Sequence, residues 1–168
     1  TGKDFPHKAS AMLYFKDIKE ACRAVVAMKK GPVMGAELLD RKSLESVNDP
    51  TGKGLTAVLT ETMANTKEEL SDQIGQIEEI LQSFDTAVPV RFTDKEEEYA
   101  PYWAIRSGIF PSVGGTRKPG TTTLIEDVAF HIENLPEATA DLQELLEKHG
   151  YADACIYGHA LEGNYHFI

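Results

Sequence analysis

The order in which predicted strands and helices alternate constrains the fold of this chain more than any other feature. Strands are predicted for the segments rich in apolar and β-branched residues, at 9–15, 33–39, 55–62 and 88–92. One helix begins at Asp17 after the first strand, and another follows the third strand. This second helix has Thr66 as a good N-cap and Glu69 three residues later, which is the capping-box spacing. The predicted order is therefore strand, helix, strand, strand, helix, strand.

This order is typical of an α+β fold of the ferredoxin-like type, in which an antiparallel sheet has its helices on one face. The same order begins again later, with a strand at 121–130, a helix at 135–149, a strand at 154–159 and a last strand from Tyr165. We therefore predict two tandem βαββαβ-type units that form one antiparallel sheet, the second unit being truncated.

The predicted organisation is a single domain over residues 1–168. Its first unit spans 1–93, a charged helix and a glycine-rich loop span 94–120, and the incomplete second unit spans 121–168. The chain opens without methionine and ends in mid-strand, and its second unit has no closing helix and strand. We therefore expect a piece cut from a longer protein.

Charge and cysteine content exclude several classes of protein. The chain has 17 basic and 27 acidic residues, and the resulting net charge of −10 has the wrong sign for a nucleic-acid binder. It has no apolar run of membrane-spanning length and no apolar leader, so we expect a soluble, intracellular domain. Cys22 and Cys155 are far apart in the sequence, so we expect two buried free thiols rather than a disulfide framework or a zinc knuckle.

The histidines His159 and His166 flank the turn residues Glu162-Gly163 near the end of the chain. In a two-residue hairpin loop they would be directly opposite each other, with Cβ atoms about 4.5–5.5 Å apart. Two imidazoles at that separation can share one divalent cation or one substrate. Two histidines alone are an incomplete metal site, however, and a half-exposed hairpin whose histidines bind nothing is the alternative.

Trp103 and Arg106 are three residues apart and share one face of a predicted helix. A guanidinium beside an aromatic ring is suited to bind a carboxylate, and the alternative is an arginine lying over an apolar surface. The glycine-rich stretch 108–120 that follows is either a substrate-facing loop or a plain connector. It contains Lys118, but Pro119 directly after it does not match the nucleotide-binding spacing.

Two adjacent acids, Glu126 and Asp127, interrupt an otherwise apolar predicted strand. Adjacent strand residues point to opposite faces, so at most one of the two faces the helices. The other is a candidate hydrogen-bond acceptor for a ligand or for a histidine.

Taken together, these motifs resemble a known family. Residues 158–166, Gly-His-Ala-Leu-Glu-Gly-Asn-Tyr-His, resemble the Gly-His-x-Gly-Asp-Gly-Asn-x-His signature of the C-terminal domain of FAD-linked oxidases. This family includes D-lactate dehydrogenases, the glycolate oxidase flavoprotein subunit and D-2-hydroxyglutarate dehydrogenase. Residues 103–106 look like its Trp-x-x-Arg, and residues 126–130 look like its Glu-Asp-Val-x-x-Pro strand. Leu161, Glu162 and His131 depart from the family pattern, so the turn geometry is expected to differ.

The resemblance implies a substrate-side domain fragment of an FAD-dependent D-2-hydroxy-acid dehydrogenase, with D-lactate as the expected substrate and hydride transfer from the α-carbon to flavin. By similarity, His159 and His166 would ligate a divalent metal such as Zn or Mn. Arg106, assisted by Lys118, would bind the substrate carboxylate. The expected cofactor contacts, also by similarity, are Gly163 and Asn164.

The resemblance also implies partners that lie outside this sequence. FAD would be bound mainly by an N-terminal domain of the same parent chain, and an iron–sulfur cluster is expected only elsewhere in that parent. The family's later Glu-His-Gly segment, with a third ligand and the base, is missing, so the fragment alone should be inactive. The parent is expected in the cytoplasm or peripherally at the inner membrane, and the exposed sheet edge suggests a homodimer.

Two other functions stay open at this stage. One is a free-standing ferredoxin-like module that binds a ligand or regulates another protein, which requires a complete fold without an exposed apolar edge. The other is a metal-dependent hydrolase that uses His159 and His166, which requires a third ligand that the sequence does not reveal.

Overall fold

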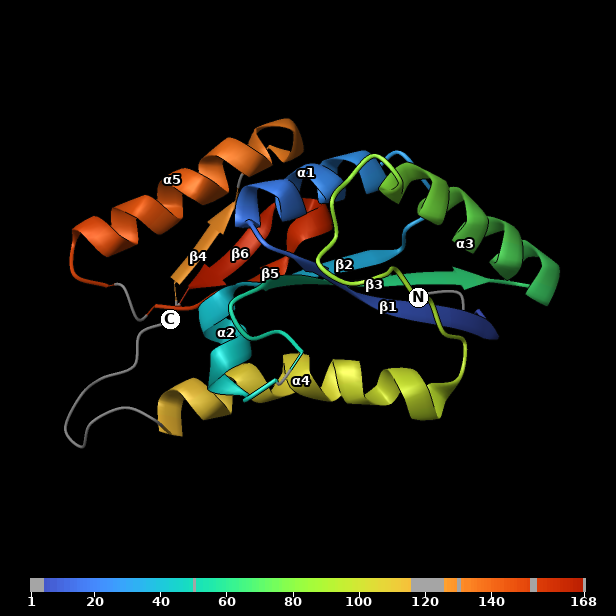
Figure 1. Cartoon of the computed structure of the whole chain (residues 1–168), viewed down its shortest axis with the longest axis horizontal. Helices are drawn as coiled ribbons and strands as arrows, with labels where there is room; N and C mark the ends of the chain where they lie inside the picture. The colour runs from blue at the N-terminus through green and yellow to red at the C-terminus, as the bar shows by residue number, and fades with distance from the viewer. Residues whose placement is uncertain (1–4, 50, 116–125, 130, 152–153, 168) are drawn as a thin grey trace.

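The computed structural model describes residues 5–49, 51–115, 126–129, 131–151 and 154–167. In this part of the chain, six strands form one sheet in the order β1-β3-β2-β5-β6-β4, and every neighbouring pair of strands is antiparallel. Helices cover both faces of the sheet (Figure 1). The predicted α+β, ferredoxin-like antiparallel architecture is confirmed.

The first unit follows the predicted element order closely. Its elements are β1 (His7–Phe15), α1 (Ile18–Met28), β2 (Gly35–Leu39), α2 (Arg41–Ser46), β3 (Thr56–Ala64) and α3 (Lys67–Leu81). Asp17 caps α1 by accepting a hydrogen bond from the Lys19 amide. Thr66 caps α3 through the Glu69 amide, as predicted, and the Glu69 carboxylate returns to the amide of Asn65.

The predicted strand at 88–92 does not form. The chain instead contacts β1 on either side of this segment, where Ala87 donates to the Tyr14 carbonyl and Thr93 makes an isolated antiparallel bridge with Ser10. Pro89 has no backbone N–H to donate to a ladder, so the pairing between these contacts is interrupted.

The remaining elements are α4 (Glu96–Gly115), β4 (Glu126–Ala129), a 3₁₀ turn η1 (Ile132–Asn134), α5 (Leu135–Lys148), β5 (Ile156–His159), a 3₁₀ turn η2 (Ala160–Glu162) and β6 (Asn164–Phe167). Helix α4 continues past the predicted end at Ser107. Ile109 is fully buried on α4, so packing against the sheet carries the helix through Gly108. Residues 116–120 of the predicted loop lie outside the described residues.

The strand order repeats about the centre of the sheet. On one side of the β2–β5 junction the strands follow the order β2, β3, β1, and on the other side the order β5, β6, β4. In the sequence, each set begins with a strand that a helix follows: β1 is followed by α1, and β4 by α5. These two helices pack together over the same face of the sheet (Figure 1). The β2–β5 junction is therefore where the two sets meet.

The helices divide between the two faces, whereas the sequence predicted them on one face. Helices α1, α3 and α5 cover one face, and α2 and α4 cover the other (Figure 1). The reason lies in the strands, because apolar side chains of β1, β2 and β3 point to both faces: Leu13, Leu38 and Val58 to the first, and Met12, Leu39 and Leu59 to the second. A second apolar face needs its own cover, which α2 and α4 provide.

Two further observations bear on the sequence predictions. Cys22 and Cys155 are both buried free thiols, as expected. Within the described ranges, the structure contains no helix whose length and apolar character suffice to cross a lipid bilayer.

Candidate functional site

A buried carboxylate at the β2–β5 junction binds two basic side chains. Glu37 of β2 is directly opposite His159 of β5 in the ladder. Its Oε1 lies 2.6 Å from Nδ1 of His159, and its Oε2 accepts a hydrogen bond from Nε of Arg106 at 3.2 Å. The Glu37 side chain is only 10% exposed, so its negative charge is compensated within the protein rather than by bulk water.

Two aromatic rings complete the arrangement. The guanidinium carbon of Arg106 lies 4.9 Å from the ring centroid of Tyr157, which is a cation–π contact. The Tyr157 ring in turn lies 5.5 Å from the ring of His166. We call these five residues the Glu37 cluster: Glu37, Arg106, Tyr157, His159 and His166. Strands β2, β5 and β6 and helix α4 supply them, on the face of the sheet that α4 covers.

The predicted register of the histidine hairpin is wrong. His159 pairs with Asn164 and His166 pairs with Tyr157, so the histidines are diagonal neighbours rather than directly opposite each other. The loop is longer than two residues, because η2 forms a 3₁₀ turn and Gly163 closes it with φ of 70°. The two imidazoles still share a face, with ring centroids 6.5 Å apart and their planes nearly perpendicular.

In the structure, the Trp103 and Arg106 side chains have different partners. The indole Nε1 of Trp103 donates to Ser10 Oγ at 3.2 Å and so ties α4 to β1. Arg106 lies over Tyr157 instead, and the carboxylate that it binds is Glu37 of the same chain. This bond uses Nε of Arg106, so the edge formed by the two Nη groups takes no part in it.

The other predicted site residues are only partly described. Lys118 lies outside the described residues, and Glu126 and Asp127 are described as the start of β4. Gly163 has the left-handed conformation that glycine adopts readily. Asn164 follows it, and its side-chain Oδ1 is buried without a hydrogen-bond partner among the residues that the structure places.

The described residues do not provide a complete metal site. Nowhere among them do three or more His, Cys, Asp or Glu side chains come together in a group that could hold a metal ion. Glu37 does, however, leave one atom of His159 available. Because Nδ1 of His159 donates to the carboxylate, Nε2 carries the lone pair of the neutral imidazole.

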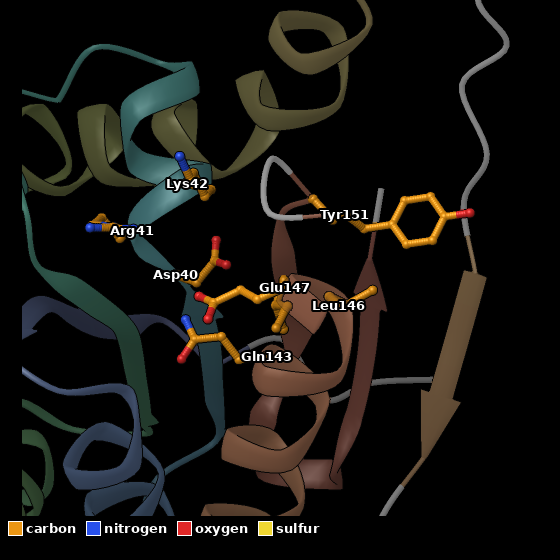
Figure 2. Close-up of a pocket in the computed structure, with 9 residues that line it drawn as sticks. Asp40, Arg41, Lys42, Gln143, Leu146, Glu147 and Tyr151 are labelled. Atoms are coloured by element: carbon orange, nitrogen blue, oxygen red, sulfur yellow. The ribbon is translucent and has the colours of Figure 1, made fainter. Parts of the chain in front are cut away.

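A separate small pocket lies at the other end of β5. Its volume of about 20 Å³ accommodates a water molecule and is too small for an organic substrate. Figure 2 shows the side chains of Asp40, from the start of α2, and Glu147, from α5, directed into it. Asp40 Oδ1 accepts hydrogen bonds from the amide and hydroxyl of Ser43, yet burial raises the pKa of Asp40 to about 6. This pocket is distinct from the Glu37 cluster, because Ile156 lines it at the first residue of β5, whereas His159 is the last.

Sequence reasoning missed Glu37 and Tyr157. Glu37 is the single charged residue in the apolar run Ala36-Glu37-Leu38-Leu39, which is a signal that the sequence contains. An acid inside a buried strand needs a partner, although nothing local identifies that partner. Tyr157 has no comparable signal, because a tyrosine in a strand is ordinary.

The fold and the Glu37 cluster first define a class of protein. All pairings in the described sheet are antiparallel, so this part of the chain is an α+β domain with a basic and aromatic cluster on one sheet face, and it is unlike a parallel dinucleotide-binding domain. The chain belongs to the family of FAD linked oxidases, C-terminal domain, whose family model matches residues 6–168. A comparison with individually curated proteins finds no match.

Family membership confirms the coarser part of the resemblance. The chain is the C-terminal-type domain of an FAD-linked oxidoreductase, and the family implies FAD as the cofactor.

Proposed function

We propose that the chain is the substrate-binding domain of an FAD-dependent D-2-hydroxy-acid dehydrogenase, with D-lactate as the substrate. The observation that carries this proposal is the Glu37 cluster, which brings one guanidinium and two imidazoles together. A 2-hydroxy acid has a carboxylate, which suits a guanidinium, and a hydroxyl, which suits an imidazole. The family supports the redox class.

Arg106 binds the substrate carboxylate in this proposal. Its Nε is held by Glu37, and the edge with the two Nη groups is the one that matches a carboxylate in a bidentate contact. The Tyr157 ring beneath the guanidinium restricts its rotation, so less entropy is lost when the ligand binds. Lys118, which we expected to assist, remains part of the proposal as a second cation.

His159 and His166 face the hydroxyl of the substrate, either directly or through a divalent cation such as Zn²⁺ or Mn²⁺. The chemistry of these residues fits such a cation in part: His159 presents Nε2 while its Nδ1 donates to a carboxylate, which is how metal-ligating histidines are generally held. Two imidazoles leave the ligand set incomplete, so a further ligand must come from elsewhere. Bound FAD supplies the hydride acceptor, and a bound cation polarises the hydroxyl oxygen.

Gly163 and Asn164 place the turn of the hairpin beside these histidines. The left-handed Gly163 lets η2 connect to β6 without strain, and it thereby fixes the register that positions His166 opposite Tyr157. The buried Oδ1 of Asn164 has no hydrogen-bond partner among the described residues, so this turn contains an acceptor that the described chain does not satisfy. We propose that an FAD-binding domain of the parent chain contacts the hairpin turn at Gly163 and Asn164.

Ligand binding to the chain tests this proposal without flavin turnover. In ¹H–¹⁵N NMR spectra, we expect D-lactate to shift the side-chain signals of Arg106, His159 and His166, and propionate, which has no hydroxyl, to shift Arg106 alone. Arg106→Gln should weaken D-lactate binding by about tenfold or more, because a charged hydrogen bond is worth about 1.5–3 kcal/mol.

The matched control is Arg91→Gln, because the Arg91 side chain is 73% exposed and its described partner is Glu98 of α4, which is not a member of the Glu37 cluster. Equal shifts by D-lactate and propionate at the histidines would overturn the assignment to hydroxy acids. Equal binding by the Arg106 and Arg91 variants would overturn the role of Arg106.

A further inference from the structure

We propose that Glu37 is a positioning residue, which selects the tautomer of His159 and holds Arg106 beside it. Glu37 touches neither substrate nor cofactor in this scheme. It acts through His159, whose Nε2 it makes available as an acceptor or ligand atom. The inference rests on the proposed function in so far as that function assigns ligand binding to His159.

The geometry of the Glu37–His159 contact supports this role. The distance of 2.6 Å between Oε1 and Nδ1 is short even for a charge-assisted hydrogen bond. An ionised carboxylate only accepts hydrogen bonds, so Nδ1 must be the donor. Since the proton of the neutral ring is then on Nδ1, the lone pair is on Nε2. The exposure of the two side chains agrees with this arrangement, because His159 is 54% exposed and Glu37 only 10%.

The second carboxylate oxygen of Glu37 fixes the orientation of the Glu37 side chain. Oε2 accepts from Nε of Arg106, and the guanidinium is in turn held over Tyr157. Arginine always carries its proton, so this side of Glu37 must always present an acceptor. One carboxylate therefore satisfies two donors that diverge from it, and an amide in the same place cannot, because it has one oxygen and one NH₂ group.

The register of the sheet provides this arrangement directly. Glu37 and His159 are paired residues of β2 and β5, the strands that join the two halves of the sheet. Their separation is thus set by backbone hydrogen bonds rather than by a loop. A site on two central strands holds its side chains more rigidly than a site on loops does.

A purely structural ion pair makes a different prediction. If Glu37 served only to neutralise Arg106, its replacement would change the stability of the fold. It would not change which ring nitrogen of His159 carries the proton. The tautomer is therefore the readout that separates the two roles. It is measured by long-range ¹H–¹⁵N NMR of the histidine rings in the full chain, in mildly alkaline buffer.

We expect the wild-type spectrum to show His159 protonated at Nδ1, with a pyridine-type Nε2. In Glu37→Gln, the amide oxygen must face Arg106, so the NH₂ group faces Nδ1 of His159, and we expect the ring to switch to the Nε2-protonated tautomer. Glu61→Gln is the matched control, because Glu61 is another partly buried strand glutamate but lies on β3, which β2 separates from His159 on β5, and it should leave the tautomer unchanged.

Zn²⁺ binding, measured by calorimetry on the same proteins, separates this inference from the proposed function. If the wild-type chain binds Zn²⁺, Glu37→Gln should weaken it by about 10–100-fold, the usual effect of removing such an outer partner. If the wild-type chain binds no Zn²⁺ but the tautomer switches, the positioning role holds and the metal role fails. An Nε2-protonated His159 in the wild type would overturn the inference without any variant, as would an unchanged tautomer in a folded Glu37→Gln.

Discussion

Gly158 and Tyr165 are opposite each other in the β5–β6 ladder, so close that no side chain fits at position 158. A Cβ atom built on Gly158 would lie 2.8 Å from the carbonyl oxygen of Asn164 and 3.1 Å from Cα of Tyr165. Gly158 also has φ of 143°, a conformation that L side chains rarely adopt. Because Gly158 lies between Tyr157 and His159, this close approach helps to set the geometry of the Glu37 cluster.

Gly158→Ala should therefore destabilise the chain by about 3 kcal/mol, since the new methyl group meets backbone atoms and the backbone conformation is strained. Urea unfolding measures the difference. Gly35→Ala is the matched control: apart from the two residues adjacent in the chain, no atom in the described part of the chain lies within 4 Å of a Cβ placed on this β2 residue. That variant should be unchanged or up to about 1 kcal/mol more stable, because alanine loses less chain entropy. Similar losses in both variants would contradict the steric argument.

The pKa of Asp40 predicts how stability depends on pH. Burial raises this pKa to about 6, whereas an aspartate in an unfolded chain has a value of about 3.9. The folded state therefore binds the proton more tightly. The stability that Asp40 contributes is fully present below about pH 4 and is lost as pH rises through 6. A shift of about two pKa units corresponds to about 3 kcal/mol.

Asp40→Asn tests this dependence, because asparagine is a good N-cap and its side-chain oxygen can still accept from Ser43. At pH 4, where Asp40 is neutral in the folded protein, we expect the two proteins to have similar free energies of unfolding. Between pH 4 and 7 the wild type should lose about 3 kcal/mol relative to the variant. Parallel curves over this range would show that Asp40 does not titrate as the structure predicts.

The sequence predicted what local interactions determine, and it failed where distant residues decide. The caps at Asp17 and Thr66 and the apolar spacing of α1 and α3 are properties of short segments, so they could be read directly. The end of α4 could not, because the burial of Ile109 against strands far away in sequence extends that helix.

The same distinction holds for the candidate site. His159, His166 and Arg106 were predicted from motifs, and the structure brings them into one cluster. Glu37, which joins Arg106 to His159, is on a distant strand, and only the pairing of β2 with β5 places it there. The diagonal position of the histidines likewise depends on η2, a turn that a two-residue hairpin rule does not include.

Trp103 provides a fluorescent probe for the docking of α4 on the sheet. It is the only tryptophan of the chain, and its indole N–H donates to the buried hydroxyl of Ser10. Ser10→Ala removes this acceptor and should lower the free energy of unfolding by about 1 kcal/mol, with an unchanged urea m-value.

Ser107→Ala is a matched control, because the exposed Ser107 hydroxyl donates to the carbonyl of Trp103 within α4 itself. We expect its stability to stay within about 0.5 kcal/mol of the wild type. If fluorescence shows the same midpoint for the wild type and Ser10→Ala, the Trp103 hydrogen bond does not contribute to the docking of α4.

The contact between Tyr165 and Cys22 makes the last prediction, on the opposite face of the sheet. Tyr165 Oη lies 3.5 Å from Cys22 Sγ, and both residues are fully buried. Burial raises the pKa of the Cys22 thiol and of the Tyr165 hydroxyl, so neither ionises readily in the folded protein. Since the thiolate is the reactive form, iodoacetamide should alkylate Cys22 only after unfolding.

Tyr165→Phe keeps the ring that fills the core and removes the hydroxyl that contacts Cys22, so we expect a loss of about 1 kcal/mol. Tyr151→Phe is the control, because Tyr151 is 63% exposed and should be neutral to this change. Mass spectrometry after brief alkylation reports thiol access, and urea unfolding reports stability. Rapid alkylation of Cys22 in the native wild type would show that the core around Tyr165 opens often enough to admit iodoacetamide. That result would contradict the prediction that burial protects Cys22 in the folded protein.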